Sequence, residues 1–596
     1  MKRFLAYGWK ASASTAIALA FTVGATHAAD DTWSSSPTDS DWGNTANWVN
    51  ATPPGSTTGT SNTDTATFTT SSIVAVTVDA GRNLQNITFG GNNTFTLSGS
   101  TLLLTSGGTI LSNGSAVDER ISAPLQIQGD GGTYKIETNT PGTNRELQIS
   151  GGISGVATTG NTTVLTLTGS SGGTNEITSA GAITNGSGGG ALALVKDGTG
   201  LWVLGQANGA NTYSGGTTIK AGTLRVSSSG NTTGLIGSGT LTLDGGTLRL
   251  QSSNSTTVNN NVVVGANGGT VSARTNDYFN PATLSGTGVL TLTPDNGLTF
   301  SSNSFKGFAG TVRALPLTSG TMSLRFVSSF DETSLANAVL VLEAGASQTR
   351  NYGTNDTRTT GIGTLSGAAG SSLGGSTSGG GIFIFSVGGR NEDSTFAGTI
   401  VDGGTKTGLT KVGSATLTLS GTNTYTGATT VAAGVLAVDG SVASTVTVQD
   451  TATLQGIGTV ANATVNAGGH VAPGNSIGTL SVTGDMTING TLDVEYDGGG
   501  SLIDLLAVTG TLDINNATVD FAPLNTALTG SPFIFATYGT LSGSQFASVV
   551  DLPGGYTIDY AYNNGTTTTN IALVPEPTAA LLAGLGLLGL VRRRRA

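Results

Sequence analysis

Hydrophobic and polar residues alternate with a period of two in many short runs along this chain of 596 residues. Residues 73–78, 164–168 and 415–419 are clear examples, and Gly, Ser and Asn separate such runs. A short alternating run predicts a half-buried β-strand, and Gly- and Asn-rich separators predict turns. No helical periodicity of ten or more residues occurs between residues 30 and 570. The pattern therefore predicts an all-β protein built from many short strands.

One stretch of this pattern occurs twice, at residues 196–226 and 408–438. The NTYSG at 211–215 corresponds to the NTYTG at 423–427, and the AGTL at 221–224 corresponds to the AGVL at 433–436. A recurring unit of roughly thirty residues is typical of a solenoid, in which each coil stacks on its neighbours. The triplet Gly-Thr-Leu also recurs, and we expect its Thr to face outward and its Leu to face the core.

Both segments resemble the autotransporter-associated β-strand repeat of large bacterial surface proteins. The resemblance covers about residues 192–226 and 408–438, and it implies a secreted, right-handed parallel β-helix. It implies no particular ligand. We expect coils of roughly 20–25 residues stacked about 4.8 Å apart, and hence a rod on the order of 100 Å long. Leu224, Val226, Leu417 and Leu419 should point into its core.

The composition agrees with a solenoid and excludes several classes of function. The chain has 93 Gly, 10% charged residues and no Cys, so disulfides and thiolate chemistry are impossible. A solenoid of this length needs no division into globular domains, because each coil buries its interior against its neighbours. The formal net charge of −11 would become more negative if both basic ends were removed, which argues against nucleic acid as a partner.

Residues 1–29 are expected to be a secretory signal peptide. A basic start precedes an apolar run that includes residues 16–21, and Ala25, Ala28 and Ala29 offer cleavage sites. The run is too short and too rich in Ala to favour a transmembrane anchor. The basic residues of the start are Lys2, Arg3 and Lys10.

Residues 30–64 hold three of the five tryptophans, Trp33, Trp42 and Trp48. Exposed indoles could stack on sugar rings. The favoured interpretation is a cap on the first coil, which would otherwise present a raw strand edge.

The body of the chain divides into a solenoid over residues 65–453 and a region resembling the passenger of autotransporter adhesins over 454–573. The Gly- and Ser-rich residues 345–385 are expected to form a bulging loop. The segment that follows Val574 is too short for a membrane barrel, so self-export through a pore of its own is not expected.

Residues 574–596 are expected to form a second targeting signal, besides the N-terminal signal peptide. Val574, Pro575, Glu576 and Pro577 precede an apolar run at 579–591 and four arginines. This order resembles the PEP-CTERM sorting signal, which implies that an exosortase recognises the motif and removes the tail. We expect the tail to anchor transiently in the inner membrane and to lie outside the fold; a permanent anchor is the alternative. The basic end comprises Arg592, Arg593, Arg594 and Arg595.

Little material for catalysis is present. His470 would be the one mature histidine, and no cofactor or metal site is expected. Asp493, Glu495, Asp497 and Asp504 form the densest acidic group in the C-terminal half, and Asp493 and Glu495 should share one strand face. Such a pair could hold calcium or cleave a glycan, but outward acids that keep the solenoid soluble are the favoured interpretation.

The leading hypothesis is an exported, non-enzymatic β-solenoid of the cell surface or extracellular matrix that associates with exopolysaccharide or neighbouring cells. A polysaccharide-cleaving lyase or hydrolase is the alternative, favoured if carboxylates from adjacent coils converge in a groove. An ice-binding protein ranks third, because Thr-x-Thr pairs at 166, 240, 291 and 416 follow no constant coil length.

Overall fold

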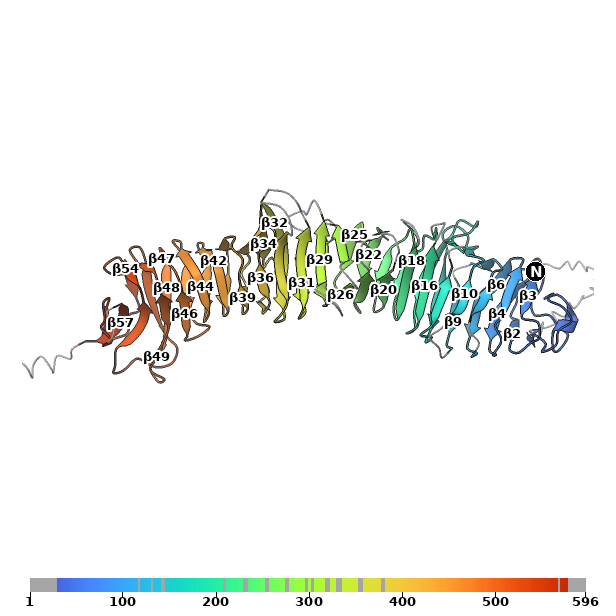
Figure 1. Cartoon of the computed structure of the whole chain (residues 1–596), viewed down its shortest axis with the longest axis horizontal. Coiled ribbons are helices and arrows are strands. Elements are labelled where there is room, and N and C mark those ends of the chain that lie inside the picture. Colours follow the sequence, from blue (N-terminus) through green and yellow to red (C-terminus); the bar gives the residue numbers. More distant parts are fainter. Residues whose placement is uncertain are drawn as a thin grey trace, which may run out of the picture.

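The computed structural model describes residues 29–576, except for short segments, and shows a right-handed parallel β-solenoid drawn out into a rod (Figure 1). This confirms the predicted fold class. Among the described residues the one helical element is the 3₁₀ turn η1 (Thr45–Asn47). The expected signal helix and the helix at 579–591 lie outside the described residues. The segments left out within the chain are 116–117, 130–131, 141–144, 179–180, 207–210, 229–233, 252–256, 274–277, 295–297, 302–304, 317–321, 328–334, 352–356, 377–380 and 566–568.

One continuous parallel ladder, here called the long ladder, runs almost from end to end of the rod. Steps of about 4.8 Å between neighbouring strands give a length on the order of 100 Å, as expected. Its strands are β3 (Ala75–Val78), β5 (Thr96–Gly99), β7 (Glu119–Ile121), β10 (Arg145–Ile149), β13 (Thr174–Ile177), β16 (Leu201–Gln206), β18 (Thr223–Ser228), β20 (Thr247–Leu250), β23 (Gly269–Ala273), β26 (Val289–Pro294), β28 (Thr311–Ala314), β30 (Leu335–Leu342), β32 (Arg358–Gly367), β35 (Ser394–Phe396), β38 (Thr416–Leu419), β41 (Val435–Val438), β43 (Thr453–Gly456), β45 (His470–Pro473), β48 (Thr491–Asp497), β52 (Thr518–Pro523) and β55 (Ser548–Val550).

Further parallel stacks complete the coils beside the long ladder. One stack of the N-terminal half comprises β1 (Asp31–Thr32), β2 (Thr65–Phe68), β4 (Asn83–Phe89), β6 (Leu102–Ser112), β9 (Thr133–Thr138), β12 (Thr162–Gly169), β15 (Ala191–Lys196), β17 (Thr217–Ile219), β19 (Leu241–Leu243), β22 (Asn261–Val264) and β25 (Thr283–Gly286), with the branch β8 (Leu125–Ile127), β11 (Ile153–Gly155) and β14 (Ile183–Thr184). A middle stack comprises β21 (Thr257–Val258), β24 (Tyr278–Phe279), β27 (Leu298–Ser301), β29 (Met322–Val327), β31 (Ala346–Asn351), β33 (Ser372–Ser376) and β36 (Thr399–Val401). The C-terminal coils add β34 (Ile382–Val387), β37 (Lys406–Lys411), β39 (Thr422–Asn423), β40 (Thr429–Val431), β42 (Ser441–Val448), β44 (Thr459–Val465), β46 (Thr479–Val482), β47 (Met486–Ile488), β50 (Leu505–Val508), β51 (Thr511–Asp513), β53 (Phe533–Thr537) and β54 (Thr540–Ser542).

The period-two pattern sorts side chains between the core and the outer surface. Leu224, Val226 and Leu419 are fully buried and Leu417 is 1% exposed, as predicted. Alternate residues of the same strands face outward, so β38 reads half-buried, buried, half-buried, buried. The core is therefore one continuous apolar column along the rod, with Thr, Ser and Asn on its outer faces.

Coil length varies more than the sequence predicted. Thr453 pairs with His470 on the next coil, and Thr491 pairs with Thr518 on the next coil. The second pair is farther apart in the sequence, so the coil that starts at Thr491 contains more residues than the coil that starts at Thr453. Residues 345–385 also differ from the expected loop, because β31, β32 and β33 continue the stacks through this segment. Ile362, Leu365 and Leu373 supply the buried apolar side chains that hold those strands, in spite of the Gly and Ser around them.

The two repeats share a set of buried polar ties between coils. The Nζ of Lys196 donates to the carbonyl oxygens of Asp197, Gly198 and Ala221, and the Nζ of Lys411 donates to those of Val412, Gly413 and Ala433, at 2.8–3.1 Å. Both lysines are at most 1% exposed, and burial lowers the pKa of each ammonium to about 8. Three carbonyl acceptors compensate an ammonium that burial would otherwise leave unsatisfied.

A second tie is an asparagine in the NTYSG and NTYTG sequences. The Oδ1 of Asn211 accepts the N–H of Ile183, and its Nδ2 donates to the carbonyl of Leu235. Asn423 makes the same pair of contacts, to Ile400 and Ser441. Each side chain thus joins the preceding coil to the following one. The residues that define the repeat in the sequence are therefore structural ties.

Antiparallel strands close the C-terminal end of the rod. β57 (Asn570–Pro575) pairs with β53 and with β56 (Tyr556–Asp559), and β49 (Leu502–Ile503) pairs back on β48. Thr557 lies beside Val574 and Tyr556 beside Pro575, while the N–H of Glu576 donates to the carbonyl of Gly555. The expectation that residues 574–596 lie wholly outside the fold is therefore wrong for Val574 and Pro575. Their pairing continues the strand that Ile571 and Leu573 anchor in the core.

Candidate binding surfaces

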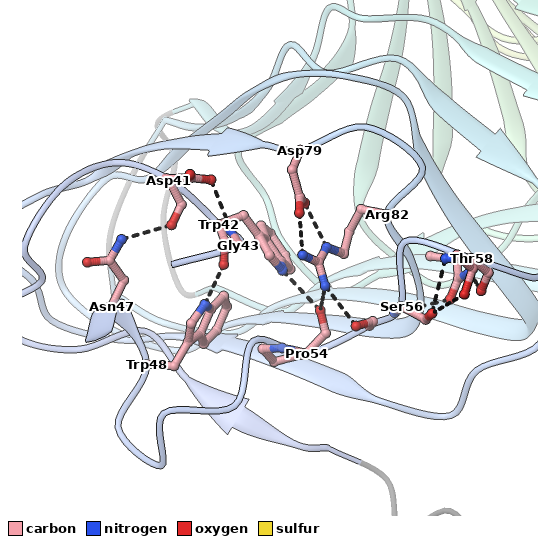
Figure 2. Close-up of polar contacts among 12 residues, drawn as sticks. Asp41, Trp42, Gly43, Asn47, Trp48, Pro54, Ser56, Thr58, Asp79 and Arg82 are labelled. Carbon is pink, nitrogen blue, oxygen red and sulfur yellow. Dashed lines mark hydrogen bonds and ion pairs between the residues drawn. The ribbon is translucent and has the colours of Figure 1, made fainter. Parts of the chain in front are cut away.

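The N-terminal tryptophans lie inside the protein. Trp33, Trp42 and Trp48 are 1%, 0% and 2% exposed, and their rings pack against one another and against Phe68 of the first coil. Figure 2 shows the indole N–H groups satisfied within the chain: Trp42 donates to the carbonyl of Pro54 and Trp48 to that of Trp42. No indole face is left for a sugar ring.

Polar ties fix the loop that carries these tryptophans. Arg82, 5% exposed, pairs with Asp79 and donates to the carbonyl oxygens of Pro54 and Gly55 (Figure 2). Asn47 is fully buried and bonds to Asp39 and to the carbonyl of Asp41. The segment therefore covers the open end of the apolar column.

Of the acidic group near the C-terminal end, Asp493, Glu495 and Asp504 line a groove of about 340 Å³, and Asp497 lies outside it. Asp493 and Glu495 share the outer face of β48, as predicted, and Asp520 of the next coil lies directly beside Asp493. Carboxylates of adjacent coils thus face one groove. Sequence reasoning missed Asp520, because the long coil that brings it there has no signature in the repeat.

Asp493 and Asp504 lie in different surroundings within the acidic group. The Nδ1 of His470 lies 2.9 Å from Asp493 Oδ2, while burial and the Asp520 charge raise the pKa of Asp493. Asp504 is 1% exposed, and burial raises its pKa to about 7. Its two oxygens accept the backbone N–H groups of Gly478 and Glu495, so it ties two coils together at the wall of the groove. Within the described residues, no group of three or more His, Asp or Glu side chains is arranged to hold a metal ion.

A larger groove of about 670 Å³ lies on the long ladder, where β30, β32, β35 and β38 stack. We call it the hydroxyl groove, because Thr and Ser supply most of its lining. Thr418 of β38 lies beside Thr395 of β35, which puts hydroxyls in a row along the rod. The lining residues are Val339, Val341, Thr364, Ser366, Asp393, Ser394, Thr395, Thr416 and Thr418.

Some of these hydroxyls are already used and others are available. Thr364 Oγ1 donates to Glu392, and Ser366 Oγ donates to the carbonyl of Thr395. The hydroxyls of Thr395, Thr416 and Thr418 form no hydrogen bond with any other described residue. Asp393 accepts the N–H of Thr416 and adds a carboxylate to the wall. Sequence reasoning missed this groove, since the Thr-x-Thr pair at 416 gives no sign of its neighbours on other coils.

The sorting residues fall at the boundary of the structure. Val574 is half-buried, and Pro575 and Glu576 are exposed at the end of β57. Pro577 and the arginines at 592–595 lie outside the described residues. Among the residues that the structure does describe, no helix has the length and apolar character needed to cross a bilayer.

Two segments of the chain, residues 194–226 and 409–438, match the passenger-associated-transport-repeat family. They contain the Lys, Asn and Tyr side chains that the two repeats share. Residues 573–595 match the PEP-CTERM protein-sorting motif. Both predicted resemblances are thereby confirmed. Together they indicate an exported protein of the cell surface or exterior, and the sorting motif implies processing by an exosortase-type enzyme.

No curated protein sequence matches the chain. Among solved structures, the crystal structure of the Haemophilus influenzae Hap adhesin is similar over 86% of this chain at 13% identity. The match spans 64% of the Hap chain, with a TM-score of 0.27.

Proposed function

We propose that this chain is a non-enzymatic surface or extracellular-matrix protein that associates with polysaccharide through the hydroxyl groove. The observation that supports this is the row of uncommitted hydroxyls on Thr395, Thr416 and Thr418 beside the Asp393 carboxylate. A polyhydroxylated chain offers donors and acceptors that complement such a row. Each contact is weak, so binding depends on several acting together.

The rigidity of the ladder favours this use. Backbone hydrogen bonds fix β35 and β38, and Phe396 and Leu417 anchor them in the core. The hydroxyls are therefore held in place before a ligand arrives, which reduces the entropy lost on binding. Sorting through the PEP-CTERM motif would deliver this surface to the exterior, where extracellular glycans are found.

Replacing Thr416 or Thr418 with Val tests the proposal. Val keeps the branched shape but removes the hydroxyl, so we expect affinity for a soluble neutral polysaccharide such as dextran or a β-glucan to fall about two- to tenfold per substitution. Titration calorimetry over a panel of such polysaccharides measures the change. Thr430→Val is the matched control, because Thr430 faces outward on β40 and lies away from the groove. Equal affinity in all three variants would contradict the assignment.

The carboxylates of the C-terminal groove favour a second candidate, a polysaccharide-cleaving enzyme, since Asp493, Glu495 and Asp520 come from adjacent coils. The contacts weigh against it. Asp493 is engaged by His470, and Asp504, whose raised pKa would suit a proton donor, has both oxygens committed to backbone N–H groups.

We therefore expect no release of reducing or unsaturated ends from pectin, alginate or similar glycans. A reducing-sugar assay and absorbance of unsaturated products measure this. Release that disappears in Asp493→Asn and Glu495→Gln, but persists in Asp497→Asn outside the groove, would establish the enzyme instead.

A further inference from the structure

A buried carboxylate meets the backbone nitrogen of Ala29 at the start of the first coil. The N–H of Ala29 donates to Asp64 Oδ1 at 2.8 Å, and the N–H of Gly55 donates to Asp64 Oδ2 at 2.8 Å. Asp64 is 7% exposed. Two backbone donors therefore satisfy both oxygens, but they carry no full positive charge.

No side-chain cation compensates this carboxylate. Within the described chain Asp64 forms no ion pair with Lys or Arg. Arg82 is engaged by Asp79 and by the carbonyl oxygens of Pro54 and Gly55. A buried charge without a counter-charge is costly, so the position calls for a cation.

Two further acids, Asp30 and Asp31, directly follow Ala29 in the chain. Asp31 is 4% exposed, and its carboxylate accepts from Asn50 and Thr52. Asp30 is exposed and accepts the N–H of Thr65. The two residues that follow Ala29 are thus both acidic and both hydrogen-bonded within the chain.

We propose that signal peptidase cuts between Ala28 and Ala29, and that the new α-ammonium of Ala29 forms an ion pair with Asp64. Water adds across that peptide bond: Ala28 leaves as a carboxylate, and the amide nitrogen of Ala29 becomes an ammonium. Its usual pKa of about 7.7–8.0 leaves it mostly charged at neutral pH. The carboxylate acceptor already makes the existing hydrogen bond charge-assisted, and the cut adds an ionised donor, so that the contact becomes an ion pair.

The geometry distinguishes this cut from the other two that the sequence permits. A cut after Ala25 would leave three residues ahead of Ala29 and keep its nitrogen a neutral amide. A cut after Ala29, which is the boundary expected from the sequence, would remove the donor to Asp64 Oδ1 altogether. Cutting after Ala28 is the choice that places a cation against the buried carboxylate. Removal of the signal peptide would then be the step that completes the N-terminal cap.

The first experiment determines where the exported protein begins. The full-length precursor is produced in a Gram-negative host with a signal peptidase, and the exported protein is analysed by N-terminal peptide mass spectrometry. We expect the sequence to start at Ala29. A start at Thr26 or Asp30 would overturn the proposal.

The second experiment tests the ion pair. Hydrogen exchange at Gly55 and Thr65 is compared between protein starting at Ala29 and protein carrying Gly-Ser before Ala29, each with Asp64 or Asp64→Asn. We expect Asp64→Asn to raise local opening about tenfold in the first protein and much less in the extended one. Asp497→Asn is the control, because Asp497 lies on β48 near the other end of the rod, and it should affect neither protein at these positions. Equal effects of Asp64→Asn in both would show that Asp64 serves only as a hydrogen-bond acceptor and would overturn the pairing.

The pH dependence gives a further readout. Pairing with Asp64 raises the pKa of the α-ammonium above its value in the unfolded chain. The added protection is therefore fully present below about pH 7.7, and it disappears as the pH rises through the raised pKa. The extended protein should show no such loss, and a loss of equal size there would count against the ion pair.

Discussion

Replacing Leu417 with Asp is expected to destabilise the C-terminal half of the solenoid by about 4 kcal/mol, which is near the upper end for single substitutions. Leu417 is 1% exposed on β38, with Ser394 beside it on one coil and Leu436 on the next. A carboxylate there would lie in the dry apolar column of the core, and the leucine packing would be lost as well. Urea unfolding followed by circular dichroism measures the change.

Thr430→Asp is the matched control for this prediction, because Thr430 lies in the same repeat but faces outward on β40. This substitution is expected to change the free energy of unfolding by no more than about 0.5 kcal/mol. Limited proteolysis should also locate new cleavages in the Leu417 variant on the coils around β38, since each coil depends mainly on its neighbours. A Leu417→Asp protein as stable and as resistant as the control would disprove the strand register.

The core could be predicted from the sequence because it depends on local alternation. A strand with apolar residues at every second position has one face to bury, whatever its neighbours are. The alternation alone predicts that Leu224, Val226, Leu417 and Leu419 point inward, and all four are buried. The tryptophans at 33, 42 and 48 were harder, because an exposed and a buried indole look alike in sequence; their contacts with Phe68 decide the matter.

Contacts between coils could not be predicted, because they depend on coil length. Lys196 and Lys411 appear in the sequence as ordinary polar residues at strand ends. Their burial follows from carbonyl groups of the next coil, on Ala221 and Ala433, which complete the acceptor set. Asp520 and the hydroxyl groove could not be predicted for the same reason. Short and long coils occur in one ladder, so the sequence spacing does not reveal which outward side chains become neighbours.

The start of the sorting signal shows a related limit. Two prolines suggested a segment outside the fold, since proline cannot donate to a ladder. Pro575 nevertheless ends β57 beside Tyr556, at a position where the strand leaves the sheet. The buried residues before it, Ile571 and Leu573, hold the strand, and exposed Pro575 and Glu576 follow from it. The sorting motif therefore begins within β57, a strand that is held in the fold at the C-terminal end of the rod.

Substituting Pro575 and Pro577 together with Ala is expected to stop removal of the tail, so that full-length chains ending at Ala596 accumulate in the membrane fraction. We expect an exosortase-type enzyme to read this motif in extended form, and Ala would allow the backbone after β57 to adopt helical angles that proline restricts. Mass spectrometry of the C-terminal peptide, from protein recovered in a host with the sorting enzyme, measures the ratio of full-length to processed chain.

The control for this experiment is Pro523→Ala, which changes a proline at the end of another strand, β52, and leaves the motif intact. The wild type, the double variant and the control should unfold at the same temperature. Pro575 is exposed and contributes no backbone donor, so its replacement removes no stabilising contact. Two outcomes would contradict the proposal. Full-length chains in the wild-type surface fraction, unchanged by the substitutions, would indicate a permanent anchor. Normal processing of the double variant would show that the enzyme reads Glu576 or the residues beyond it, with no need for the prolines.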